Sequence, residues 1–470
     1  MPWIWLAGFG FALLLVSPFW FPTPDSVSYL SISRSLGFYG EPRNLGSPHP
    51  MYSIGYPALI VPLVRWSPSN PFFLLSLFHA ILAIGLLFAV RKWASGLDEI
   101  PAALVANLTL ANAVVLAIFR RDLSEVAFMP LLMMAVITLQ AIRDKLPNPG
   151  GKRLLFAAAL LFLLVIVRPT GMLFAAGFAL VLARSVVQRQ IRWAKAIRLF
   201  VFVTGPALLA LASLMVFEQI TAGRSQEISN FDMLLNHRLV EADENLAQRF
   251  LEGLRIRISE VGRLTVPGMF GAFASRGNWR DWNLLVYVPV FALVCLGWWK
   301  SLGRQTDVLV LTFPFYFLLH AYWPWDQAGR YFAPLLPMLF MCLWHGLHFL
   351  RGQRLRLFQI LLVLHLAVSL GFWVVREVPR GLQNQRDWPA LQALAEIIPT
   401  DVQPAMASSD NTDAGLILAW MLDRPVVQVG HGEALPKQVH WLLLLENETP
   451  PPGFALRGRK GRFQLLERNP

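Results

Sequence analysis

The sequence predicts an all-α polytopic membrane protein with about 11 transmembrane helices and a small C-terminal α/β domain. Of its 470 residues, 55% are hydrophobic and only 15% are charged, whereas soluble domains carry about 25% charged residues. Apolar segments long enough to cross a bilayer recur through residues 1–380, and the pattern stops in residues 381–470. This composition excludes an ordinary soluble enzyme and a disordered chain.

The first predicted span, residues 3–21, has no basic n-region and no cleavage site, so we expect a retained helix rather than a signal peptide. Later in the chain, Arg168-Pro169-Thr170-Gly171 separates two segments that are each short for a membrane helix. The other ten apolar segments centre on residues 70–90, 100–118, 124–141, 154–167, 171–187, 198–217, 284–299, 306–321, 331–350 and 357–375.

The net charge of +12 reflects 41 Lys and Arg against 29 Asp and Glu. If the N-terminus is cytoplasmic and the spans alternate, the cytoplasmic turns carry 16 basic residues and three acidic ones. This asymmetry is the positive-inside pattern, so the basicity indicates topology rather than nucleic-acid binding. The basic residues are Arg91, Lys92, Arg143, Lys145, Lys152, Arg153, Arg184, Arg189, Arg192, Lys195, Arg198, Lys300, Arg304, Arg351, Arg354 and Arg356.

The same topology places two long loops, residues 22–56 and 218–282, and the C-terminal domain outside the cytoplasm. In the first loop, residues 26–38 have the pattern of a short helix; in the second, residues 246–261 suit either an interfacial helix or a packed loop helix. We predict a transmembrane catalytic domain over 1–380 and a small extracytoplasmic domain over 381–470. In the tail, helices are expected at 387–398 and 413–422, and strands at 404–408, 425–429, 441–445 and 463–466.

Charged residues are costly in a bilayer, so those that gather at one end of the predicted helices are functional candidates. The topology, derived from other residues, places all of them at the outer face, which indicates one site assembled from several loops. Carboxylates there could act as a general base or hold a divalent metal, and arginines could bind a phosphate with paired hydrogen bonds. The candidates are Asp25, His49, Tyr52, Tyr56, Arg120, Arg121, Asp122, Glu125, Arg168, Asp326, Arg330 and Tyr331.

Several of these candidates also have a plainer interpretation. Asp25 follows a proline and could cap the next helix. Arg121 and Glu125 have the i, i+4 spacing of an ion pair on a helix. Arg168 could extend to lipid headgroups, and Arg330 with its neighbouring tyrosine could be an interfacial anchor.

Five short motifs in this order resemble those of the GT-C superfamily of membrane glycosyltransferases, in the branch that includes lipid A aminoarabinose transferase and protein O-mannosyltransferases. Together they span the membrane region, residues 1–380. The motifs are Pro24-Asp25-Ser26 with Tyr29, Gly55-Tyr56-Pro57-Ala58-Leu59, Asp122-Leu123-Ser124-Glu125, Arg168-Pro169-Thr170-Gly171, and Arg330-Tyr331 with Pro334 and Pro337.

The resemblance implies a GT-C fold and an enzyme that moves a sugar, with inversion, from a polyprenyl-phosphate donor to a lipid, glycan or protein acceptor at the outer face of the bacterial inner membrane. It makes Asp25 the catalytic carboxylate, with Asp122 and Glu125 as further catalytic candidates. A divalent metal could be shared by Asp25 and Asp122, although the first loop has one acid where some members carry a pair. The residues expected to line the substrates are Tyr29, His49, Tyr52, Tyr56, Arg121, Arg168, Arg330 and Tyr331.

Other function classes stay open at this point. A transporter usually places its site near the midplane between repeated halves, whereas this sequence has no repeat and its charges gather at one face. Another lipid-processing transferase, or a scaffold whose tail binds a partner, would share the composition. Cysteine chemistry is not expected, because Cys295 and Cys342 both lie inside apolar segments.

Overall fold

The computed structural model divides the chain into two compact units. Unit 1 comprises Met1–Val16, Phe78–Phe119 and Ser124–Phe372, and unit 2 comprises Ser17–Leu77, Arg120–Leu123 and Trp373–Pro470. His49, Tyr52, Asp326 and most of the strand predicted at 425–429 lie outside the described residues. The structure describes residues 2–48, 53–97, 100–225, 246–267, 279–304, 307–322, 329–350, 352–399, 406–407, 412–425, 440–446 and 448–468.

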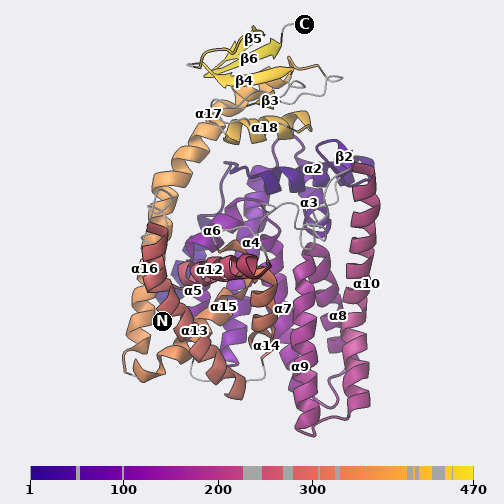
Figure 1. The fold of residues 1–470 in the computed structure, drawn as a ribbon, viewed down its shortest axis with the longest axis vertical. Coiled ribbons are helices and arrows are strands. Elements are labelled where there is room, and N and C mark those ends of the chain that lie inside the picture. The colour runs from indigo at the N-terminus through magenta and orange to yellow at the C-terminus, as the bar shows by residue number, and fades with distance from the viewer. Residues whose placement is uncertain are drawn as a thin grey trace. The chain divides into compact units, whose positions relative to one another are not determined.

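Unit 1 is helical (Figure 1), and its helices pack in adjacent pairs: α8 against α7 and α10, α9 against α14, and α13 against α12 and α15. Its elements are α1 (Pro2–Leu13), α4 (Phe72–Ser95, which starts in unit 2), α5 (Ala102–Leu110), α6 (Ala113–Arg120), α7 (Glu125–Arg143), α8 (Gly151–Val167), η1 (Pro169–Met172), α9 (Leu173–Val187), α10 (Trp193–Ser225), α12 (Leu246–Thr265), α13 (Trp279–Arg304), α14 (Val308–Ala321), η3 (Arg330–Leu335), α15 (Leu336–Gly346), η4 (Leu347–Leu350) and α16 (Arg354–Phe372).

Seven helical segments among the described residues are long and apolar enough to cross a membrane, or eight if the bent pair α5 and α6 is one span. The predicted count of 11 is therefore not confirmed. Three predicted segments form helices that are too short: α1 has 12 residues, α8 has 17 and α14 has 14. Arg168-Pro169 ends α8 at the boundary that the sequence predicts, because a residue before proline avoids the helical conformation.

The bend of 55° between α5 and α6 has a local cause. Asn112, which lies in the break, accepts a hydrogen bond from the Val114 amide at 3.0 Å and donates one to the Leu264 carbonyl at 2.8 Å. A side chain that satisfies the backbone of the next turn lets a new helix start in a different direction.

Close backbone contact holds α13 and α15 together. A Cβ built on Gly297 would lie 1.7 Å from the Cys342 carbonyl oxygen, and one on Gly346 would lie 2.1 Å from that of Leu293. Reciprocal glycines of this kind let two apolar helices approach through their backbones, which is how membrane helices gain van der Waals contact without a hydrophobic driving force.

Unit 2 combines two helices near the start of the chain with the C-terminal region. The helix predicted at 26–38 is present as α2 (Pro24–Tyr39), which packs against α3 (Gly55–Trp66) and α18 (Thr412–Leu422). The hairpin β1 (Arg43–Asn44) and β2 (Ser47–Pro48) lies between α2 and α3 in sequence. A π-helical turn, η5 (Trp373–Glu377), leads into α17 (Val378–Ala395).

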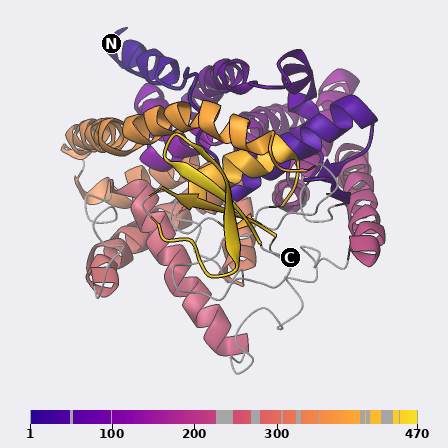
Figure 2. The same ribbon diagram turned by 90° about the horizontal axis from the view of Figure 1, so that it is seen from above.

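The C-terminal sheet has the strand order β3-β4-β6-β5, with β3 parallel to β4 and the other pairs antiparallel. Leu442, Leu444 and Leu466 are buried together in this sheet, and α17 packs against β5 and β6. Figure 2 shows the sheet lying over α17 and α18. The strands are β3 (Met406–Ala407), β4 (Trp441–Leu445), β5 (Phe454–Lys460) and β6 (Phe463–Arg468).

Three of the predicted strands are therefore present, and β5 was missed. Its sequence is FALRGRK, with three basic residues and a glycine. Those residues are typical of an edge strand, where charge discourages pairing with another chain, and an edge strand lacks the apolar alternation by which strands are recognised.

Candidate functional site

The carboxylate of Glu125 lies at the centre of a charged cluster in unit 1. Its side chain is fully buried at the first residue of α7, and it forms ion pairs with both Arg168 and Arg330. The Arg330 Nη2 donates to Glu125 Oε2 at 3.1 Å, and its Nε contacts the other carboxylate oxygen. Three motifs that are far apart in sequence thus meet in unit 1.

Backbone constraints place both arginines. Pro169 holds Arg168 in an extended conformation, with φ −150° and ψ 124°, so that its side chain leaves the line of α8. Gly329 has φ 89°, a left-handed conformation that favours glycine, and it turns the chain immediately before Arg330 opens η3. The proline and the glycine that interrupt the apolar segments therefore also orient the two guanidinium groups.

Aromatic rings surround the cluster. The Arg168 guanidinium carbon lies 5.8 Å from the Tyr331 ring centroid and 5.9 Å from that of Phe128, within the range of cation–π attraction. The Tyr331 carbonyl accepts a hydrogen bond from the Tyr316 hydroxyl at 2.7 Å. The ring of His320 stacks on Tyr316, with centroids 4.4 Å apart.

Arg257 and Glu260 join this neighbourhood, and sequence reasoning missed them. Both are fully buried in α12, Arg257 Nη1 donates to Glu260 Oε2 at 2.5 Å, and the Arg257 guanidinium carbon lies 5.9 Å from the Tyr331 ring centroid. The helix predicted at 246–261 is present, but these charged residues face inward. With Arg168 and Arg330 against Glu125, the cluster holds three guanidinium groups and two carboxylates, which gives it a net charge of +1 at neutral pH.

In unit 2, Asp25 is the second residue of α2 and is half-buried. It does not cap the helix. Thr23 Oγ1 accepts from the Ser26 amide at 3.1 Å and Ser26 Oγ accepts from the Thr23 amide at 2.8 Å, which together form a capping box. The capping interpretation is therefore wrong for Asp25, although its charge still favours the helix N-terminus.

Two tyrosines lie close to one another on neighbouring helices of unit 2. Tyr29, one turn after Asp25, meets Tyr56 edge-to-face at a centroid distance of 5.3 Å, and both are buried. Such a pair fixes α2 against α3 and so holds the N-terminal turn of α2 in place.

The loop Arg120–Leu123 belongs to unit 2 and does not form the predicted i, i+4 ion pair. Arg121 contacts the buried Glu377 at 3.4 Å, whereas Glu125 pairs with the other arginines. Asp122 has φ 49°, which breaks the helical path between Arg121 and Glu125. Asp122 is only 5% exposed, and this burial raises its pKa to about 7.

Polar residues of α17 bind the segment that precedes α2. Arg380 forms two hydrogen bonds of 2.5 Å with Asp413 of α18 and donates to the Pro22 carbonyl at 3.2 Å. Asn384 donates to the Trp20 carbonyl at 3.1 Å. These contacts fix the chain just before the Thr23 cap, and hence the start of the helix that carries Asp25.

Comparison with known proteins identifies the fold of the chain. No family model matches the chain, and neither does a curated protein. Among solved structures, the chain is similar to ArnT from Cupriavidus metallidurans bound to undecaprenyl phosphate, with a TM-score of 0.58 and 11% identity over 99% of this chain and 98% of that one. The chain has the GT-C fold.

Two further structures agree with the GT-C fold. The apo state of the same ArnT gives a TM-score of 0.57 at 12% identity, over 99% of this chain and 97% of that one. An oligosaccharyltransferase from Archaeoglobus fulgidus, in complex with Zn and sulfate, gives 0.52 at 12% identity, over 93% of this chain and 68% of that one. The fold predicted from the five motifs is confirmed.

No group of three or more His, Cys, Asp or Glu side chains among the described residues is placed to hold a metal ion. Asp25 and Asp122 alone do not form the six or more oxygen ligands that a hard divalent cation takes, so waters or substrate oxygens would have to complete the set.

Proposed function

We propose that this protein is a membrane glycosyltransferase that moves a sugar from a polyprenyl-phosphate donor to an acceptor at the outer face of the membrane, with inversion. The observation that carries the proposal is the buried Glu125–Arg168–Arg330 cluster, which is net positive and set among aromatic rings. The GT-C fold, shared with a protein bound to undecaprenyl phosphate, supports the same choice of donor.

In the proposed reaction, the Asp25 carboxylate accepts the proton of the acceptor's nucleophilic group. The acceptor atom then forms a bond to the anomeric carbon, and the bond from that carbon to the phosphate oxygen breaks. The electron pair leaves with the lipid phosphate, whose growing negative charge is stabilised by Arg168 and Arg330. Because phosphate is a good leaving group, the reaction does not require a strong base.

Glu125 has a positioning role in this proposal. A buried carboxylate shared by two guanidinium groups fixes their orientation and lowers their combined charge from +2 to +1. The remaining positive charge suits one phosphate, and a planar guanidinium offers donors to a carboxylate and a phosphate at once. Tyr29 and Tyr56 would support Asp25 from the neighbouring helices.

Asp122 has a second proposed role as a proton carrier. Its pKa of about 7 lies where a general acid or base works best at neutral pH. A divalent ion shared by Asp25 and Asp122 stays a prediction, and activity that survives EDTA and fails to rise with Mg²⁺, Mn²⁺ or Zn²⁺ would contradict it.

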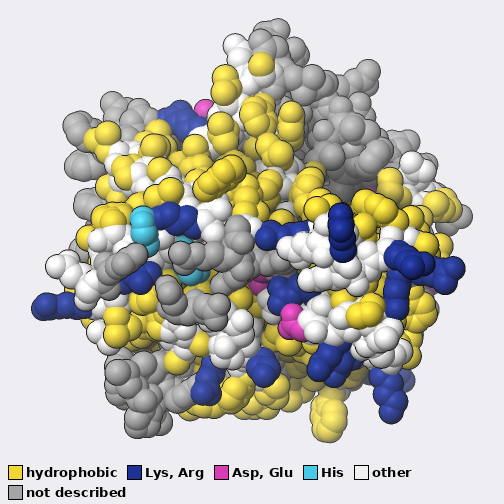
Figure 3. Space-filling model, turned by 90° about the horizontal axis from the view of Figure 1, so that it is seen from below, with side chains coloured by type: hydrophobic (Ala, Val, Ile, Leu, Met, Phe, Trp, Pro, Cys, Tyr) yellow, Lys and Arg dark blue, Asp and Glu magenta, His cyan; other side chains and the backbone are white. Residues whose placement is uncertain are grey.

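The orientation of the protein in the membrane is proposed from the charge of the turns between its helices. Lys and Arg are spread over the lower face of the molecule, where few Asp or Glu are seen (Figure 3), and this is the pattern of a cytoplasmic face. Impermeant labelling of cysteines placed at Ser225 and Ser409 in intact cells tests it, because both positions are expected to be extracytoplasmic. Ser409 lies outside the described residues.

The function is tested by supplying the purified protein, in lipid vesicles, with polyprenyl-phosphate sugars and a panel of lipid, glycan and peptide acceptors. We expect release of polyprenyl phosphate together with a glycosylated product, and no transfer from nucleotide sugars. Vesicle uptake of labelled solutes in the absence of any transfer would favour the transporter instead.

A further inference from the structure

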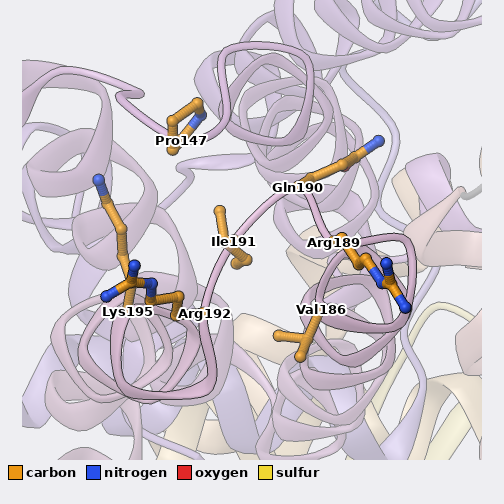
Figure 4. Close-up of a pocket in the computed structure, with 7 residues that line it drawn as sticks. All are labelled: Pro147, Val186, Arg189, Gln190, Ile191, Arg192 and Lys195. Carbon is orange, nitrogen blue, oxygen red and sulfur yellow. The ribbon is translucent and has the colours of Figure 1, made fainter.

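A pocket at the other end of unit 1 carries three basic side chains and no acidic one. It has a volume of about 500 Å³ and is lined by Pro147, Val186, Arg189, Gln190, Ile191, Arg192 and Lys195. Figure 4 shows Arg192 and Lys195 together on one side and Arg189 on the other, with Ile191 between them. We call it the basic pocket. It uses none of the residues of the proposed transfer reaction.

The backbone around the basic pocket is held in a defined shape. At the end of α9, the Gln190 amide donates to the Ser185 carbonyl at 2.9 Å and Arg189 has φ 60°. This is the left-handed helix end that glycine usually occupies. Lys195 Nζ donates to Oδ1 of Asn148, which follows the lining residue Pro147, at 2.9 Å.

An apolar surface runs away from the pocket along α10. Trp193, Ile197 and Val201 follow one another at four-residue spacing and are 59%, 58% and 59% exposed. Four-residue spacing places side chains on one face of a helix. Trp193, the first residue of this face, directly follows the lining residue Arg192, and tryptophan is typical of the boundary between lipid headgroups and acyl chains.

We propose that the basic pocket binds the headgroup of an anionic phospholipid whose acyl chains lie along Trp193, Ile197 and Val201. Three cations without a nearby lining acid suit a phosphate-bearing anionic headgroup rather than a zwitterionic one, in which an ammonium group would be repelled. The lipid form of the phosphate is favoured over a free anion because the exposed apolar face begins at Trp193, directly after the lining residue Arg192. Bound there, the lipid joins the turn between α7 and α8 to the start of α10.

The test is lipid binding by the full-length protein in detergent, followed by native mass spectrometry with phosphatidylglycerol and with phosphatidylcholine of the same chains. Each basic residue near an anionic lipid strengthens attraction roughly fivefold. The triple variant Arg189→Gln/Arg192→Gln/Lys195→Gln is therefore expected to bind phosphatidylglycerol roughly 100-fold more weakly than wild type. A matched triple, Lys92→Gln/Arg153→Gln/Arg356→Gln, removes the same charge outside the pocket lining and should bind as wild type.

A single substitution tests the pocket in a variant that is expected to fold normally. Arg189→Gly removes one cation and places glycine where φ is positive, so the fold should be at least as stable while binding weakens roughly fivefold. Equal losses in both triples, equal binding of the two lipids, or displacement of the lipid by millimolar inorganic phosphate would each overturn the proposal, the last by showing a site for a free anion.

Discussion

Glu125 and Asp25 are both acids at the start of a helix, yet their surroundings differ in kind. Glu125 is fully buried and its charge is balanced by two arginines of unit 1. Asp25 is half-buried in unit 2, on a helix that Thr23 and Ser26 already cap. A carboxylate held by two guanidinium groups is suited to organising charge, whereas one that is partly exposed and not needed for capping is suited to accepting a proton. Similar sequence contexts therefore lead to different proposed roles.

The largest expected effect on stability is at Glu125. Glu125→Gln leaves Arg168 and Arg330 without their shared counter-charge, and breaking a buried ion pair in this way costs about 3–5 kcal/mol. Thermal unfolding in detergent measures it. The matched control is Glu252→Gln, which breaks an exposed pair with Arg255 and should cost about 1 kcal/mol or less. Similar melting of the two variants would show that the cluster is not structurally important.

Asp122 should make stability depend on pH. Its folded pKa of about 7 lies above the usual aspartate value of 3.8, so between these two values the folded state holds a proton that the unfolded state releases. This contribution is fully present below about pH 4 and is lost as pH rises through 7, at up to roughly 1.4 kcal/mol per pH unit. Denaturant unfolding between pH 4 and 8 should show the slope, and Asp122→Asn should remove it. An unchanged profile in that variant would contradict the assignment.

Arg168→Lys and Arg330→Lys should each reduce turnover by roughly 10- to 100-fold, because lysine keeps the charge but loses the paired hydrogen bonds. The assay is sugar transfer by folded, reconstituted protein, with kcat and KM measured separately. Arg255→Lys, at an exposed position of the same unit, serves as the control. Full activity in both variants would reduce these residues to structural anchors.

The smallest expected effect is on stability at the start of α2, where capping by Thr23 can be distinguished from the proposed catalytic role of Asp25. Thr23→Ala removes the side-chain cap and should cost about 1 kcal/mol of stability. Asp25→Asn keeps the cap and should change stability by less than about 0.5 kcal/mol. Thermal melts of both variants decide this, and a greater loss for Asp25→Asn would restore the capping interpretation.

Sequence reasoning found most of the candidate residues because each of them interrupts an apolar pattern. It could not find their partners. The i, i+4 rule paired Arg121 with Glu125, but it holds only inside a continuous helix, and the positive φ of Asp122 breaks the chain between them. Likewise, the charges of Arg257 and Glu260 resemble the polar face of an amphipathic helix, and only tertiary packing shows that they are buried.

The fold was predicted better than the number of spans. Hydropathy located a helix at each of the 11 apolar segments, because an apolar run must satisfy its backbone hydrogen bonds internally. The number of spans was less predictable, because α1, α8 and α14 have only 12, 17 and 14 residues; α1 ends inside its predicted segment, whereas α8 and α14 end where theirs do. In the tail, the buried β4 and β6 carry the apolar signal, whereas the charged edge strand β5 does not.

Asp25 is the proposed base of a sugar transfer from a polyprenyl-phosphate donor. The most direct measurement is transfer by purified, folded Asp25→Asn protein, compared with wild type at equal protein and donor concentrations. Removing a general base should lower turnover by roughly 10²–10⁴-fold while the melting temperature stays that of wild type. Near-normal turnover by the folded variant would contradict the account.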